Sequence, residues 1–157
     1  MNGIGAVIIA MAMHFQSSVD SGVIVERRAD GGITLRNERV QLVISREQGA
    51  LHEEYYGFAG KWRLLLRSGN SLRPEPSLMS DGKVLQAEFT EVAVTDTVER
   101  PTVELRARAG NHTITKEITL GPDDAFFHVR VTDRVTGVAN LSHLLTTYSF
   151  VPDGKNY

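Results

Sequence analysis

Residues 113–120, with the sequence TITKEITL, decide the fold class because their side chains alternate between two kinds. Threonines and a glutamate fill one phase, while the other contains Ile114, Lys116, Ile118 and Leu120. Successive side chains of a β-strand point to opposite faces of the sheet, so a period of two is typical of a strand with one buried and one solvated face. The stretch therefore predicts a β-strand.

The same period of two recurs on both sides of this stretch, and Val, Ile and Thr are frequent there, as they are in strands. We expect the apolar phase of each stretch to be buried. Besides Ile114 and Ile118, this prediction covers Val40, Leu42, Ile44, Val103, Leu105, Phe127, Val129 and Val131. No segment has the 3.6-residue period of a helix. The sequence predicts an all-β protein, an antiparallel β-sandwich.

Short clusters of turn-forming residues separate the predicted strands at intervals of roughly ten residues, as in antiparallel sandwiches and barrels. Asp81-Gly82, Gly110-Asn111 and the group from Gly121 to Asp124 are examples. The segment Leu72–Ser77 contains two prolines, which a central strand does not tolerate. We therefore expect it to be a surface loop between sheets.

Composition limits the function classes. The chain has 157 residues, enough for one domain, and a net charge of −2, so a nucleic-acid partner bound through basic excess is not expected. It contains no cysteine, which excludes disulfides, thiolate metal sites and a cysteine nucleophile. No apolar run reaches the roughly 18 residues that span a bilayer, and no membrane partner is expected.

The two ends of the chain suggest a wider context. Residues 1–22 are interpreted as a signal-like or irregular segment, because an apolar stretch is followed by Ala10-Met11-Ala12, although no Lys or Arg precedes it. If residues 1–12 are a signal, an extracellular or periplasmic location is favoured. Residues 23–157 form the sandwich domain. A turn at Pro152-Asp153-Gly154 near the end predicts that the domain continues beyond this chain.

Motifs of catalysis are missing from the sequence. On a strand, Glu53 and Glu54 point to opposite faces and cannot form a glycosidase pair. Ser142-His143 has no recognisable third member of a triad, and His112 and His128 are interpreted as surface residues. We therefore predict no catalytic residue, no metal site and no cofactor.

The densest aromatic cluster lies between residues 55 and 62, beside several charged groups. Sugar sites combine flat rings, which stack on pyranose faces, with polar groups that bind hydroxyls. The alternative for Trp62 is a place in the core. The predicted ligand-binding residues are His52, Glu54, Tyr55, Tyr56, Trp62 and Arg63.

Two parts of the sequence resemble galactose-mutarotase-like, or supersandwich, domains. These are Ile33–Leu51, with its Gly49-Ala50-Leu51 turn, and His112–Leu120, followed by Asp123-Asp124 and Phe127–Val131. The resemblance extends from about Gly31 to Val135. Full supersandwich domains usually exceed 157 residues, so the resemblance implies an incomplete version of that fold.

The resemblance implies an association with carbohydrate. Such domains occur at the N-terminus of, or as accessories in, bacterial glycoside hydrolases and polysaccharide lyases, and as free-standing epimerases that use a His and a Glu. Neither residue can be assigned here by motif. The prediction is a non-catalytic carbohydrate-associated domain of a larger glycoside hydrolase-type enzyme, with the rest of that polypeptide and weakly bound carbohydrate as partners. Two alternatives stay open, a mutarotase-like epimerase or a fragment of one, and a structural or protein-interaction sandwich without a sugar ligand.

Overall fold

The computed structural model describes residues 22–68, 77–95, 100–137, 141–145 and 148–150, with no helix in these ranges. Every strand pairing is antiparallel, which confirms the predicted all-β antiparallel class. The strands are β1 (Ile24–Arg27), β2 (Ile33–Arg36), β3 (Val40–Glu47), β4 (Ala50–Phe58), β5 (Trp62–Ser68), β6 (Ser77–Ser80), β7 (Lys83–Gln86), β8 (Phe89–Thr95), β9 (Thr102–Ala109), β10 (His112–Thr119), β11 (His128–Val135), β12 (Leu141–Leu145) and β13 (Tyr148–Phe150).

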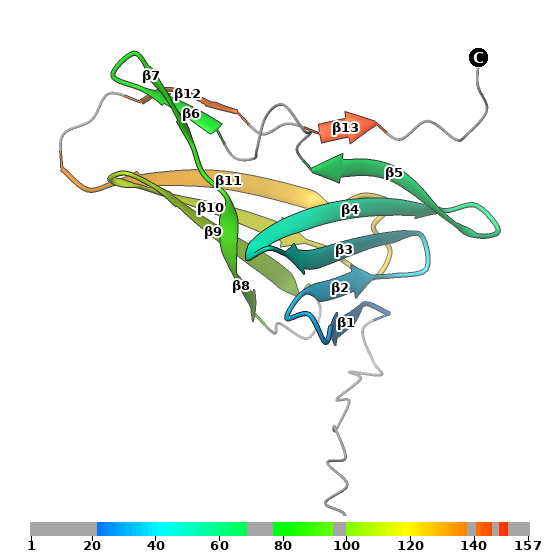
Figure 1. The fold of residues 1–157 in the computed structure, drawn as a ribbon. Coiled ribbons are helices and arrows are strands. Elements are labelled where there is room, and N and C mark those ends of the chain that lie inside the picture. The colour runs from blue at the N-terminus through cyan, green and yellow to red at the C-terminus, as the bar shows by residue number, and fades with distance from the viewer. Residues whose placement is uncertain (1–21, 69–76, 96–99, 138–140, 146–147, 151–157) are drawn as a thin grey trace, which may run out of the picture.

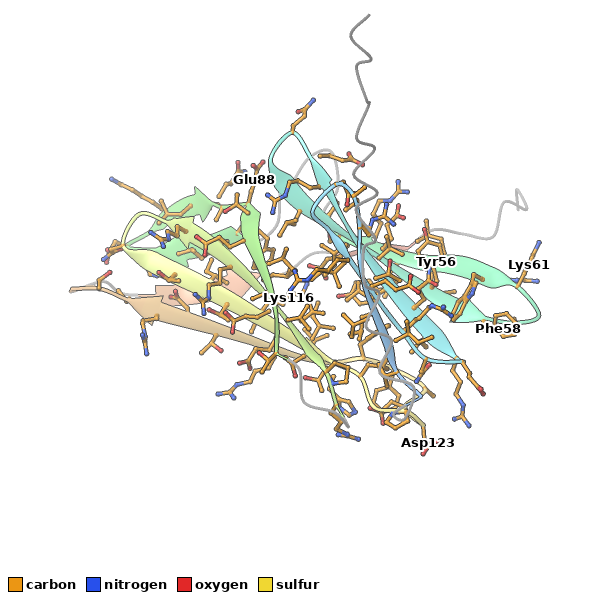
Figure 2. The ribbon with its side chains drawn as sticks, turned by 90° about the horizontal axis from the view of Figure 1, so that it is seen from below. Tyr56, Phe58, Lys61, Glu88, Lys116 and Asp123 are labelled. Atoms are coloured by element: carbon orange, nitrogen blue, oxygen red, sulfur yellow. The ribbon has the colours of Figure 1, made fainter. Side chains whose placement is uncertain are left out.

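These strands form three sheets in a sandwich-like arrangement (Figure 1). The largest has six strands in the order β1-β2-β3-β4-β5-β13, the second has the order β11-β10-β9-β8, and a small third sheet has the order β12-β6-β7. Side chains fill the space between the six-stranded and four-stranded sheets (Figure 2). The core therefore lies between two sheets, each of which turns its apolar phase inward.

Nine of the ten positions that the alternating pattern predicted to be buried belong to this core or pack against it. Among the positions predicted to be buried, Val40, Phe127 and Val131 are partly buried and pack against it. The fully buried ones are Leu42, Ile44, Val103, Leu105, Ile114 and Ile118.

Val129 is the exception, and its predicted burial is wrong, because the residue is 44% exposed. It pairs with Ile118 and so shares the inward face of the four-stranded sheet. However, β11 is the edge strand of that sheet. An edge strand can carry the right phase and still lie outside the region that the opposite sheet covers.

Tight turns connect several neighbouring strands. Asp81 and Gly82 both have a positive φ, at 48° and 73°, and form the two-residue link of the β6–β7 hairpin. Such a turn requires a left-handed backbone at both central positions, which Asp-Gly adopts readily. The predicted turn near Asp124 is also present, since its backbone N–H donates to the Gly121 carbonyl.

Three sequence predictions fall outside the described residues. They concern the signal-like segment, of which only Gly22 is described, most of the proline-containing loop, and the turn near the C-terminus. Within the described ranges no helix is long and apolar enough to cross a membrane.

Candidate functional site

The two faces of β4 carry different chemistry, as the alternating pattern predicts. Leu51, Glu53 and Tyr55 are buried, and the intervening side chains are only half-buried. Residues paired across an antiparallel sheet share a face, so β3 and β5 extend the outer side of β4. We call this side the outer face, and define it by His52, Glu54, Tyr56, Phe58, Trp62, Leu64 and Arg67.

Glu54 is the centre of the polar half of the outer face. The Tyr56 hydroxyl donates to its Oε2 at 2.6 Å, and Nε of Arg67 donates to its Oε1 at 2.9 Å. Burial by itself raises the pKa of Glu54, but the hydrogen bond from Tyr56 and the charge of Arg67 outweigh it and hold the pKa below its ordinary value. Glu54 is therefore a fixed carboxylate and a poor proton donor at neutral pH.

The hydrogen bond between Tyr56 and Glu54 changes the pKa of Tyr56 in the opposite direction. Burial and the hydrogen bond to the Glu54 carboxylate raise its pKa to about 12. A phenolate at this position would lie against a negative charge, and the neutral hydroxyl is therefore favoured. The ring is held in one orientation by its hydroxyl.

Phe58 and Trp62 form the apolar half of the outer face. They are directly paired across the β4–β5 hairpin, with ring centroids 5.2 Å apart and an interplanar angle of 63°. Phe58 is 51% exposed, and Trp62 is half-buried. Figure 2 shows Tyr56 and Phe58 on the side of the six-stranded sheet away from the four-stranded sheet. Trp62 is thus neither a core residue nor fully exposed.

The structure divides the predicted ligand-binding residues between two sides. His52, Glu54, Tyr56 and Trp62 lie together on the outer face. Arg63 is exposed, but it follows Trp62 along β5 and so points to the other side of the sheet. Tyr55 is buried in the interior, where its ring contacts Phe127 edge-on at 5.5 Å. Phe58 and Arg67, which were not in the predicted set, complete the face.

The interior contains charged residues that the sequence reasoning did not assign to a site. Lys116 of β10 donates to Glu53 of β4 at 2.8 Å, and both are fully buried. The Tyr55 hydroxyl also donates to Glu53, and the Phe89 ring centroid lies 5.8 Å from the Lys116 ammonium. The available signal was the phase of Lys116, which lies two residues from both Ile114 and Ile118 and so shares their buried side of the strand.

His112 corrects a second prediction. It was interpreted as a surface residue, but it is fully buried and forms hydrogen bonds with Ser80 and Asp133. The reason is visible in the sequence, because His112 lies two residues before Ile114 and shares its inward phase. His128 is half exposed at its side chain, which confirms the surface interpretation for that residue.

In the part of the chain that the structure describes, no group of three or more His, Asp or Glu residues is placed to hold a metal ion. Comparisons with protein-family models, curated proteins and solved structures found no match to this chain. The class of protein is therefore defined by the fold and the site alone. It is an all-β antiparallel protein with a sheet face that combines aromatic and polar side chains.

Proposed function

We propose that the chain is a carbohydrate-associated β-sandwich domain of a larger carbohydrate-active enzyme of the glycoside hydrolase type, and that its outer face contacts sugar without catalysis. The observation that carries the proposal is the pair of Phe58, which is exposed, and Trp62, which is half-buried, beside Tyr56 on one sheet face. A flat face needs exposed rings to hold a pyranose, because stacking supplies most of the affinity while hydroxyl hydrogen bonds only exchange with water.

The polar neighbours on the outer face fit this function. Arg67 and the Glu54 carboxylate are paired with each other, with side chains 56% and 22% exposed, so both can reach hydroxyl groups at the edge of a stacked ring. Gln41 of β3 is paired with Tyr56 and adds an amide on the same face. The combination resembles a shallow binding surface rather than an enclosed pocket, and it supports weak single-site affinity.

The epimerase alternative receives less support from the same geometry. His52 and Glu54 share a face, as an acid and a base would have to. However, Glu54 is held ionised by Tyr56 and Arg67, and its lowered pKa is the wrong direction for a general acid. The outer face therefore supports binding more than proton transfer.

The test is a titration of isotopically labelled protein with a panel of oligosaccharides, followed by NMR. We expect shifts at Tyr56, Phe58 and Trp62, with dissociation constants of about 0.01–5 mM, as a shallow face buries little ligand. Trp62→Ala should weaken binding by about tenfold, equivalent to about 1.4 kcal/mol.

Phe126→Ala is the matched control, because Phe126 is a 64% exposed aromatic residue that is not on the outer face. It should leave the affinity unchanged. Shifts confined to another surface, or none across the panel, would favour the structural or protein-interaction alternative. Anomerisation of a sugar by the purified chain, lost on His52→Ala, would favour the epimerase.

A further inference from the structure

A buried chain of hydrogen bonds links three strands that do not contribute to the outer face. Ser80 is the last residue of β6, His112 is the first of β10, and Asp133 lies in β11. The Ser80 Oγ is 3.1 Å from His112 Nε2, and His112 Nδ1 is 2.7 Å from Asp133 Oδ2. A hydroxyl, an imidazole and a carboxylate thus lie in sequence within hydrogen-bond distance.

The local fold explains how the three side chains meet. Ser80 directly precedes the tight Asp81-Gly82 turn and is paired with Lys83. His112 is paired with Val135, and Asp133 is therefore its diagonal neighbour on the same face of β11. Diagonal neighbours in an antiparallel pair are within reach of long side chains. Each residue is held by regular sheet structure, which preorganises the arrangement.

The hydrogen bonds assign a role to each group. The carboxylate of Asp133 accepts a hydrogen bond from the Nδ1–H of His112, and this tautomer leaves the lone pair of His112 Nε2 facing the Ser80 hydroxyl. Asp133 Oδ1 is buried without a hydrogen-bond partner among the described residues, so within them the carboxylate serves the imidazole alone. A nucleophile beside a base that a third group orients is the pattern of serine acyl transfer.

We infer that Ser80 is a nucleophile toward carboxylic esters, with His112 as its general base and Asp133 as a positioning residue. Ser80 Oγ forms a bond to the acyl carbon while its proton moves to His112 Nε2. The bond from that carbon to the alcohol oxygen then breaks, and His112 returns the proton to the departing alcohol. Water cleaves the acyl-serine by the same proton path, which restores Ser80 and releases the carboxylic acid.

Burial limits the substrate class. Ser80 is only 6% exposed, so we restrict the proposed substrates to esters of short acyl groups such as acetyl and leave out long chains and peptides. The site lies on β6, β10 and β11, and the proposed sugar contact lies on β4 and β5. The inference therefore goes beyond the proposed carbohydrate function and does not rest on it.

The first test treats the whole chain with a fluorophosphonate probe and measures intact mass. We expect one adduct, which peptide mass spectrometry places on Ser80. Ser80→Ala should abolish it, and His112→Gln should slow its formation by more than tenfold, since general bases contribute about 10²–10⁴-fold. Ser77→Ala, at the other end of β6, should have no effect. Circular dichroism checks that each variant is folded.

A second test uses the absence of cysteine from the chain. Ser80→Cys introduces the only thiol, and an adjacent imidazole increases the thiolate fraction of such a group. We expect iodoacetamide to alkylate it at least about tenfold faster than the more exposed thiol of Ser77→Cys, and this advantage should vanish with His112→Gln. Folded wild-type protein without an adduct at Ser80, or a Ser80→Cys thiol no faster than that of Ser77→Cys, would overturn the inference.

Discussion

The Lys116 ammonium lies 2.8 Å from Glu53 Oε1, and both side chains are fully buried. Figure 2 shows Lys116 in the space between the two larger sheets. The pair connects β10 of the four-stranded sheet with β4 of the six-stranded sheet. Two charges removed from water lose several kcal/mol of solvation each, and their mutual attraction offsets this only in good geometry. The two sheets can therefore dock in few registers other than the one that brings these charges together.

Replacing Lys116 with Met should strongly destabilise the protein. The substitution removes one charge and leaves the Glu53 carboxylate buried, so the free energy of unfolding should fall by about 3–5 kcal/mol. Urea unfolding followed by circular dichroism measures the change. Adding Glu53→Gln to Lys116→Met should recover much of it, because the amide is neutral and its oxygen can still accept from Tyr55.

An exposed ion pair provides the matched control for this prediction. Arg67→Met breaks the contact with Glu54 on the outer face, where Arg67 is more than half exposed. Pairs of this kind contribute about 0–1 kcal/mol. Equal losses for Lys116→Met and Arg67→Met would show that the interior pair has no special role in stability.

The strands, and the side of each strand that faces inward, could be predicted from alternation alone. That same phase placed Lys116 among buried residues, and it also places His112 there, although the polar character of His112 suggested a surface position. Alternation describes one strand at a time. The partners of His112 in β6 and β11 lie 32 and 21 residues away along the chain, and no local pattern links them.

Alternation also could not predict whether a strand lies at the centre or at the edge of its sheet. Val103, Ile118 and Val129 form one row across β9, β10 and β11 on the same face. The first two are fully buried, whereas Val129 is 44% exposed. The difference arises from the strand order and from the extent of the opposite sheet, which depend on contacts between distant segments. Four of the six predicted ligand-binding residues do lie on the outer face, because most of that face belongs to one hairpin, whereas Tyr55 and Arg63 belong to the opposite phase of its strands.

The difference in burial between Val103 and Val129 can be tested by placing the same charge at each position. Val129→Asp should fold, with a loss of stability within about 1 kcal/mol, because a half-exposed carboxylate keeps much of its water. Val103→Asp places the same charge in a fully buried position without a partner and should prevent folding. Circular dichroism and urea unfolding distinguish the two. Failure of Val129→Asp to fold would mean that β11 is covered in solution.

Gly32 should tolerate no side chain. A Cβ at this position would lie 2.0 Å from the carbonyl oxygen of Ile44, so the backbone of β2 or β3 would have to move. Gly32→Ala should cost about 1–3 kcal/mol, as overpacking does. Gly57→Ala is the control, since its Cβ would meet only the flexible end of Leu65, at 3.0 Å. Thermal unfolding of both variants measures the difference, and equal losses would contradict the close approach.

Acid should remove the stabilisation that Glu54 provides. Its pKa in the folded state is below the ordinary value of 4.5, so the ionised form favours folding above that pH, and the contribution is lost as the pH falls through the folded value. Asp30 acts in the same direction, since the Gly32 N–H holds its pKa below 3.8. Unfolding free energies measured between neutral pH and pH 3 should decline less steeply in Glu54→Gln than in the wild type. Equal pH dependence of the unfolding free energy in the two proteins would show that Glu54 does not provide this stabilisation.

Alkali should remove the stabilisation that Tyr56 provides, just as acid removes that of Glu54. Its pKa is raised from 10.0 to about 12, so the folded state holds this proton more tightly than the unfolded state does. The contribution to stability is complete below pH 10 and is lost as the pH rises through 12.

The chain has four tyrosines, and the ultraviolet titration of wild-type protein minus that of Tyr56→Phe isolates this residue. The difference should show one tyrosine that ionises near pH 12. Glu54→Gln should lower that midpoint, because the charge that opposes the phenolate is removed, and an unchanged midpoint would exclude the Tyr56–Glu54 hydrogen bond as a cause.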